Sequence, residues 1–206
     1  MTMQTQTPST TKPALRMRAP RRSRVADMIE TEGLTVEQWD ALPDTKPRYE
    51  LIDGQLVQKM PTKRRHSQAA GQLLFALMSW GAERGWQFFP EGTGVAIAPR
   101  RAYVPDVIGF EPGVVLNPDE SVGGTPFLVA EVLSDSTSRR DRTDKARDYA
   151  RLGVALYLII DPEARTLEVF RLTGRRYAAP EMFAHDAVWQ PVELPEFGLQ
   201  VARLWM

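Results

Sequence analysis

The chain has 206 residues, 43% of them hydrophobic and 25% charged, which is the composition of one soluble globular domain with a sizeable core. It contains no cysteine, which excludes disulfides, zinc–cysteine centres and thiol catalysis and fits a reducing cytoplasm. The formal net charge is zero, and with only two histidines a bound metal ion would be held mainly by carboxylates, which favours Mg²⁺ or Mn²⁺.

The first 26 residues differ in composition from the rest of the chain. They are rich in Thr, Pro, Ser and Arg, contain six basic residues and no acid, and show no apolar periodicity. We therefore expect residues 1–26 to form a disordered basic tail and residues 27–206 to form a single domain. The tail is either simply solvated or an arm that binds phosphate, and segments of this composition also resemble organelle transit peptides.

A short helix and a hairpin are the first predicted elements. Thr35 has the character of an N-cap, and Gln38 completes a capping box, which predicts a helix over residues 36–42. The dipeptide Asp53-Gly54 lies between two apolar runs and is a strong signal for a type I′ turn. The two strands of this hairpin are expected at residues 48–52 and 55–60.

An apolar stripe at helical spacing predicts a long helix over residues 67–83 that ends near Gly85. The stripe consists of Ala70, Leu73, Leu74, Leu77 and Met78. Three short strands are then expected near residues 94–98, 103–110 and 127–133.

A second helix is predicted over residues 141–152, closed by Gly153 at the C′ position. Strands are expected at residues 156–161 and 167–171, followed by weaker strands and turns. The longest apolar run, residues 154–160, is far too short to cross a bilayer, so we expect no membrane partner. The order of elements predicts an α/β fold, a mixed sheet with helices packed on it.

Two carboxylates interrupt the apolar strands, Asp106 after Pro105 and Glu131 within residues 127–133. A buried carboxylate is costly unless it is paired or bound to a cation. Either one taken alone is often a satisfied structural acid. Two of them in neighbouring strands, followed by a cationic helix, favour a metal-binding site.

Lys145 is the candidate cation for this site. Side chains two apart on a strand share a face, so Glu131 and Leu133 point the same way, and Leu133 stands where a nuclease of the Glu-x-Lys type has its lysine. Lys145, in the helix that follows, is the natural substitute. The alternative is an ordinary surface pair between Asp141 and Lys145 on one side of the helix.

These motifs have counterparts in a known family. They are Tyr49 to Gly54, Pro105-Asp106, Glu131 to Thr137, Asp141, Lys145, Tyr149, Gly153-Val154, Tyr157 and Asp161. Together they resemble the Uma-type restriction endonuclease family of the PD-(D/E)XK nuclease superfamily, over roughly residues 34–172. The family's usual Glu-Tyr-Trp is replaced here by Leu156-Tyr157-Leu158, a hydrophobic change that would alter at most a partner surface.

The resemblance implies a restriction-endonuclease-like core, binding of Mg²⁺ or Mn²⁺, and cleavage of phosphodiester bonds. Its metal-binding acids correspond to Asp106 and Glu131, and its catalytic lysine corresponds to Lys145. An early catalytic glutamate corresponds to Glu50, for which a solvent-facing place on the hairpin is the alternative. A histidine before the first core helix corresponds to His66, which either contacts phosphate or is an ordinary surface residue.

The basic residues Arg139, Arg140 and Arg142 precede the second helix and are candidates for contacts with a nucleic-acid backbone, with a solvated loop as the default. The leading function is a Mg²⁺-dependent DNA endonuclease in the cytoplasm. The alternative is a non-catalytic nucleic-acid-binding or assembly protein that keeps the fold. Because a double-strand cut needs two sites, we expect a homodimer.

Overall fold

A seven-stranded mixed sheet forms the centre of the protein in the computed structural model, which describes residues 33–42, 48–117, 123–134 and 138–206. The predicted tail, residues 1–26, lies outside the described residues. The strands are β3 (Gln87–Pro90), β6 (Val107–Phe110), β7 (Leu128–Val132), β8 (Leu156–Asp161), β9 (Thr166–Thr173), β10 (Arg176–Tyr177) and β11 (Glu181–Ala184). Their order is β10-β9-β8-β7-β6-β3, with β11 also paired to β9, and β7 and β8 run parallel.

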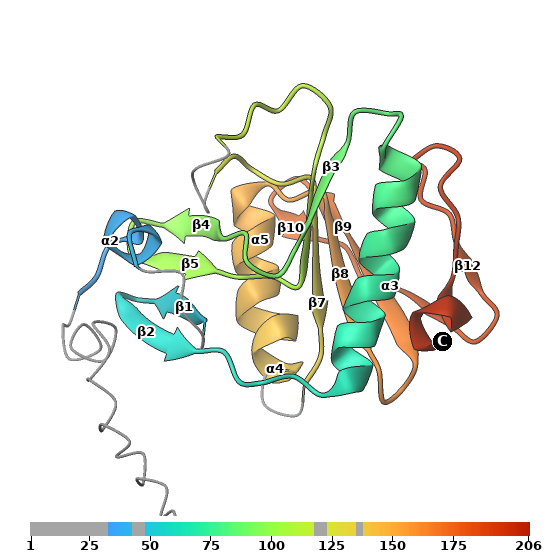
Figure 1. The fold of residues 1–206 in the computed structure, drawn as a ribbon, viewed down its shortest axis with the longest axis horizontal. Helices are drawn as coiled ribbons and strands as arrows, with labels where there is room; N and C mark the ends of the chain where they lie inside the picture. The colour runs from blue at the N-terminus through green and yellow to red at the C-terminus, as the bar shows by residue number, and fades with distance from the viewer. Residues whose placement is uncertain (1–32, 43–47, 118–122, 135–137) are drawn as a thin grey trace, which may run out of the picture.

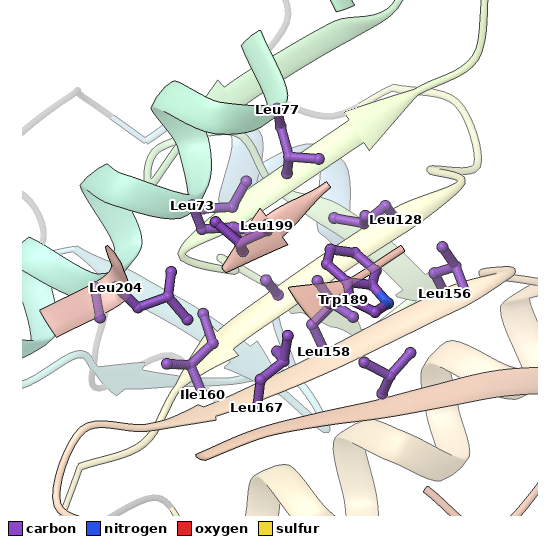
Figure 2. Close-up of a cluster of buried hydrophobic side chains, with 14 of the residues drawn as sticks. Leu73, Leu77, Leu128, Leu156, Leu158, Ile160, Leu167, Trp189, Leu199 and Leu204 are labelled. Carbon is purple, nitrogen blue, oxygen red and sulfur yellow. The ribbon is translucent and has the colours of Figure 1, made fainter. Parts of the chain in front are cut away.

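Helices cover both faces of this sheet (Figure 1). On one face α3 (Arg64–Gly81) buries Leu73 and Leu77 against β7 and β8. The C-terminal elements β12 (Val188–Trp189), β13 (Leu199–Gln200) and the 3₁₀ helix η2 (Val201–Trp205) pack into the same cluster, as Figure 2 shows. On the other face α5 (Ala146–Leu152) packs Tyr149 against Val129 and Ile159.

Strand β7 alternates between these two layers. Leu128, Ala130 and Val132 belong to the cluster under α3, whereas Val129 and Leu133 belong to the cluster under α5. Glu131 therefore faces α5, on the same side as Leu133, as the period of two predicts. This orientation brings the glutamate towards the helix that carries Lys145.

A second, smaller sheet lies beside the first and has the order β2-β1-β5-β4 (Figure 1). Its strands are β1 (Tyr49–Ile52), β2 (Gln55–Gln58), β4 (Val95–Ala98) and β5 (Arg101–Tyr103), and α2 (Val36–Asp40) packs on it. The capping box of Thr35 and Gln38 is present. Asp53 and Gly54 both have positive φ, 52° and 86°, so the predicted tight hairpin turn is confirmed.

The second predicted helix is less regular than expected. It begins with α4 (Ser138–Arg140), continues as a π-helix η1 (Asp141–Lys145) and ends as α5. Gly153 closes it in the left-handed conformation, with φ of 99°, as predicted. A π-turn of this kind is uncommon and occurs frequently at functional sites, and here it ends at Lys145.

Some sequence predictions were wrong. Helix α3 begins earlier than expected and buries His66 and Ala69, while Met78 is 50% exposed, because several stripes satisfy the same helical spacing. The strand expected at residues 103–110 is split into β5 and β6, which belong to different sheets. Pro105 lies between them and has no N–H for a ladder.

Strand β3 was also missed, whereas the expected strand over residues 156–161 is present as β8. Leu156 and Leu158 are fully buried in the central sheet, so neither contributes to an exposed surface. Among the described residues, no helix combines the length and the apolar character needed to cross a bilayer.

Candidate active site

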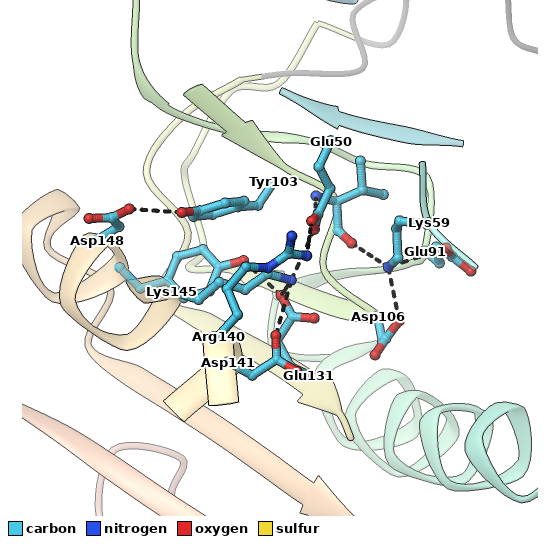
Figure 3. Close-up of polar contacts among 12 residues, drawn as sticks. Glu50, Lys59, Glu91, Tyr103, Asp106, Glu131, Arg140, Asp141, Lys145 and Asp148 are labelled. Carbon is cyan, nitrogen blue, oxygen red and sulfur yellow. Dashed lines mark hydrogen bonds and ion pairs between the residues drawn. The ribbon is translucent and has the colours of Figure 1, made fainter. Parts of the chain in front are cut away.

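A cavity of about 440 Å³ opens where the carboxyl end of β7, the start of α3 and the β1–β2 hairpin meet. Its titratable lining residues are Glu50, Lys59, Lys63, Arg65, His66, Asp106, Glu131, Arg140 and Lys145. The structure thus brings together the predicted residues Asp106, Glu131, Lys145, Glu50 and His66. Figure 3 shows how the acidic and basic side chains approach one another from separate elements.

Asp106 lies just before β6, and backbone contacts place it beside Glu131. Its N–H donates to the Ala130 carbonyl at 3.1 Å, and its Oδ2 accepts from the Val132 N–H at 2.7 Å. His66 Nε2, from the first turn of α3, lies 3.2 Å from the same oxygen. Burial by itself raises the pKa of Asp106, but the contact with His66, the charge of Lys59 and the Val132 N–H outweigh it and hold that pKa well below the ordinary value.

Glu131 projects from near the carboxyl end of β7 into the layer under α5. Its Oε1 accepts hydrogen bonds from Lys145 Nζ at 2.7 Å and from the Tyr149 hydroxyl at 2.9 Å. Complete burial raises the pKa of Glu131 to about 8; Lys145 opposes this shift, and the nearby Asp141 and Asp106 reinforce it. Burial is thus the main cause of the raised pKa, and the neighbouring carboxylates add to it.

Lys145 lies at the centre of the acidic side chains, with an exposed fraction of 2%. Its Nζ is 2.7 Å from Glu131, 2.9 Å from Glu50 and 3.5 Å from Asp141. Burial alone would lower the pKa of Lys145, but the three carboxylates raise it further than burial lowers it, so the lysine stays protonated. The simple surface pair with Asp141, the alternative considered from the sequence, is therefore wrong.

Glu50 is fully buried in β1, so a solvent-facing place on the hairpin is wrong for it. Its Oε1 accepts weakly from the Val104 N–H at 3.4 Å and pairs with Lys145, while Oε2 accepts from Arg140. Burial raises the pKa of Glu50, but Lys145 and Arg140 lower it by more, so the net pKa is lowered. Glu50 acts as a bridge between the small sheet and the helix that carries Lys145.

A further layer of polar contacts supports Lys145 from outside the cavity. The Tyr103 hydroxyl donates to Asp148 Oδ2 at 2.8 Å, and Arg101 donates to the same oxygen at 2.8 Å. Arg101 also donates to Asp53 in the hairpin turn, and the Lys145 ammonium lies 5.3 Å from the centre of the Tyr103 ring. These contacts join the hairpin to α5 and restrict where Lys145 can point.

Lys59 was missed as a site residue by the sequence reasoning. Its Nζ donates to the Val104 carbonyl at 2.7 Å and to Asp106 Oδ1 at 3.3 Å. Glu91 Oε1 is also 3.3 Å away. A lysine at the end of an apolar hairpin strand was the available signal, but a pattern of that kind is common and does not identify a partner.

The three arginines predicted to contact nucleic acid lie in different places in the structure. Arg140 lines the cavity and pairs with Glu50, whereas Arg139 and Arg142 are not among its lining residues. Arg142 instead pairs with Glu168 on β9. His66 is buried at the cavity rather than on the open surface, so its interpretation as an ordinary surface histidine is wrong.

Lys63 and Arg65, at the start of α3, line the mouth of the cavity and were not predicted from the sequence. They add positive charge there, and Arg65 also forms an exposed pair with Glu163.

The donor set fits a divalent cation held by two carboxylates. Asp106 and Glu131 line one cavity, and Asp106 lies close enough to Glu131 for its charge to add to the rise in the pKa of Glu131 that burial causes. The described residues contain no group of three or more His, Cys, Asp or Glu side chains placed to hold a metal. Protein sites for Mg²⁺ commonly use one or two carboxylates and complete the shell with water and substrate.

Comparison with known proteins gives a family and a fold. The Uma2 family model, described as "Putative restriction endonuclease", matches residues 36–202. The chain is similar to the crystal structure of a "putative nuclease belonging to DUF820" from Anabaena variabilis ATCC 29413, with 23% identity and a TM-score of 0.70. That likeness covers 84% of this chain and 97% of the other, and it establishes a shared fold. No curated protein matches.

Proposed function

This chain belongs to the Uma2 family and has a nuclease-like fold, and from that premise we propose that it is a metal-dependent endonuclease that hydrolyses phosphodiester bonds of DNA. The observation that carries the proposal is the meeting of Asp106, Glu131 and Lys145 at one cavity. Two carboxylates and a protonated lysine are the groups required to hold a divalent cation and to offset charge on a phosphate.

A divalent cation bound by Asp106 and Glu131 would polarise the phosphate and lower the pKa of a bound water. Lys145 donates hydrogen bonds, because the surrounding carboxylates raise its pKa and keep it protonated. It is therefore suited to orient the attacking water or to stabilise negative charge on a phosphate oxygen, and it is not suited to accept a proton. Glu50 and Tyr149 hold the Lys145–Glu131 pair in place.

The charge at the cavity mouth supports an anionic substrate. Lys63 and Arg65 line the entrance beside the buried acids. Lysine and arginine at such a position bind the phosphate backbone of a nucleic acid without reading its sequence. The charged groups inside the cavity and the basic residues at its entrance together fit a phosphodiester whose reacting phosphate enters the cavity.

Cleavage of supercoiled plasmid DNA tests this function. We expect the purified protein to nick or linearise the plasmid with Mg²⁺ or Mn²⁺ and to be inactive with EDTA. Asp106→Asn, purified identically, should lose the activity and thereby control for a contaminating nuclease. A parallel RNA substrate determines the preference between the two nucleic acids.

The alternative function, a nucleic-acid-binding or assembly protein without catalysis, gives a different result in the same experiment. In that case neither the wild type nor Asp106→Asn would cut, while both would bind duplex DNA with equal affinity. Such a result would reject the endonuclease.

A further inference from the structure

Lys59 carries a second ammonium group into the candidate active site. It directly follows strand β2, where its backbone N–H donates to the Arg48 carbonyl at 2.8 Å. Its side chain is 15% exposed and lines the same cavity as Asp106 and Glu131. Figure 3 shows the ammonium group between Asp106 and Glu91.

The two oxygens of Asp106 have different partners. Oδ2 accepts from the Val132 N–H at 2.7 Å and lies 3.2 Å from His66 Nε2. Oδ1 accepts from Lys59 Nζ at 3.3 Å. Oδ1 is therefore the oxygen best placed to coordinate a cation, and the lysine ammonium occupies that position.

Lys59 also has contacts that would remain if it left Asp106. Its Nζ donates to the Val104 carbonyl at 2.7 Å, the shortest of its contacts, and lies 3.3 Å from Glu91 Oε1. A small rotation of the side chain can thus open the Asp106 contact while both other partners are kept. A divalent cation on Asp106 would favour that rotation, because two positive charges a few ångströms apart repel strongly in a buried site.

We propose that Lys59 is a resident cation on Asp106, which a divalent metal ion must displace before the site is loaded. The proposal rests on the proposed metal-dependent function. It adds that a side chain of the protein itself, Lys59, competes with the metal ion for Asp106. In the metal-free protein Lys59 neutralises Asp106. In the metal-bound protein it is held by Val104 and Glu91 at the cavity wall.

Calorimetric titration with Mn²⁺ tests the proposal without any activity measurement. Lys59→Met removes the competing charge and should tighten Mn²⁺ binding by about tenfold or more, as expected when a like charge near the ion is removed. Lys59→Arg keeps the charge and is the matched control, with an affinity close to that of the wild type. Thermal unfolding of each variant verifies that it is folded.

A second variant provides a test that does not depend on the stability of Lys59→Met. Glu91→Gln removes the outer partner of Lys59, shifts the ammonium towards Asp106, and should weaken Mn²⁺ binding. Glu91 is at the edge of the site, with a side chain that is 39% exposed, so this change disturbs the fold least.

The outcomes separate this inference from the function on which it rests. If the wild type binds Mn²⁺ and Asp106→Asn does not, but Lys59→Met binds no more tightly than Lys59→Arg, the resident-cation role is overturned and the metal site stands. If Asp106→Asn binds Mn²⁺ as well as the wild type does, or if neither the wild type nor Lys59→Met binds it, both proposals fail.

Discussion

Lys145 Nζ lies 2.7 Å from Glu131 Oε1, and the two side chains are only 2% and 4% exposed. The pair joins the helical layer to the middle of the central sheet, and Glu50 and Asp141 share the same ammonium group. Removing one partner of a buried ion pair leaves an uncompensated charge, which is far more costly than losing a surface pair. Lys145 is thus important for stability as well as for the proposed chemistry.

Substitution of Lys145 should affect both properties. Lys145→Met should lower the free energy of unfolding of the metal-free protein by about 3–5 kcal/mol, because buried carboxylates lose their cation. It should also reduce cleavage by about 100-fold or more, the effect of losing one preorganised donor. Urea denaturation with and without Mg²⁺, together with plasmid cleavage, measures the two effects.

Lys145→Arg is the matched variant for this position. It keeps the charge, but the broader guanidinium does not fit a fully enclosed site, so it should recover stability better than cleavage. Cleavage at the wild-type rate by Lys145→Met would reject the catalytic assignment and leave the metal ions or Arg140 as the source of positive charge.

Glu131 should make the metal-free protein less stable as the pH rises. Burial raises the pKa of Glu131 to about 8 in the folded protein, against 4.5 for an ordinary glutamate. Between these values the folded state holds a proton that the unfolded chain has released, so stability declines from about pH 4.5 to about pH 8. Glu131→Gln should lack this contribution, and its melting temperature in EDTA should rise relative to the wild type across that interval. Parallel pH profiles of the two proteins would contradict the shift.

Lys63 and Arg65 should bind the nucleic-acid backbone, whereas Arg139 should not. The double variant Lys63→Ala/Arg65→Ala should weaken duplex binding and lower the salt dependence of the affinity by about one unit of slope for each phosphate that is no longer neutralised. Arg139→Ala is the control, because Arg139 is exposed but does not line the cavity. Fluorescence anisotropy at several salt concentrations, in the Asp106→Asn background, measures the affinity for duplex DNA and its salt dependence. If the double variant and Arg139→Ala weaken DNA binding equally, the binding depends on general surface charge and not on the residues at the cavity mouth.

We expect the protein to be a symmetric dimer, because cutting both strands of a duplex requires two active sites. Leu156 and Leu158 are buried in the central sheet and offer no apolar interface, so the expectation depends on the requirement for two sites. Light scattering should give twice the mass of the chain at working concentrations. A monomer mass, combined with cleavage that produces only nicked plasmid, would show that each molecule cuts one strand.

Local features of the chain were predictable from the sequence because neighbouring residues determine them. Asp53-Gly54 forms a tight turn because both residues tolerate positive φ, and Gly153 ends a helix for the same reason. The face of Glu131 followed from the strand period of two, whereas its contact with Lys145 was one of two arrangements that the sequence left open.

The remaining contacts depended on how distant segments pack, which no local pattern encodes. Lys59 reaches Asp106 across 47 positions, and Arg140 reaches Glu50 across 90. Both contacts exist because the small sheet lies against the open end of the central one, where β5 and β6 separate at Pro105. The sequence by itself determined which residues carry charge into apolar strands and helices. Only the tertiary structure decided which of them are close enough to neutralise one another, because the energy of a buried charge depends on distance and burial and not on position along the chain.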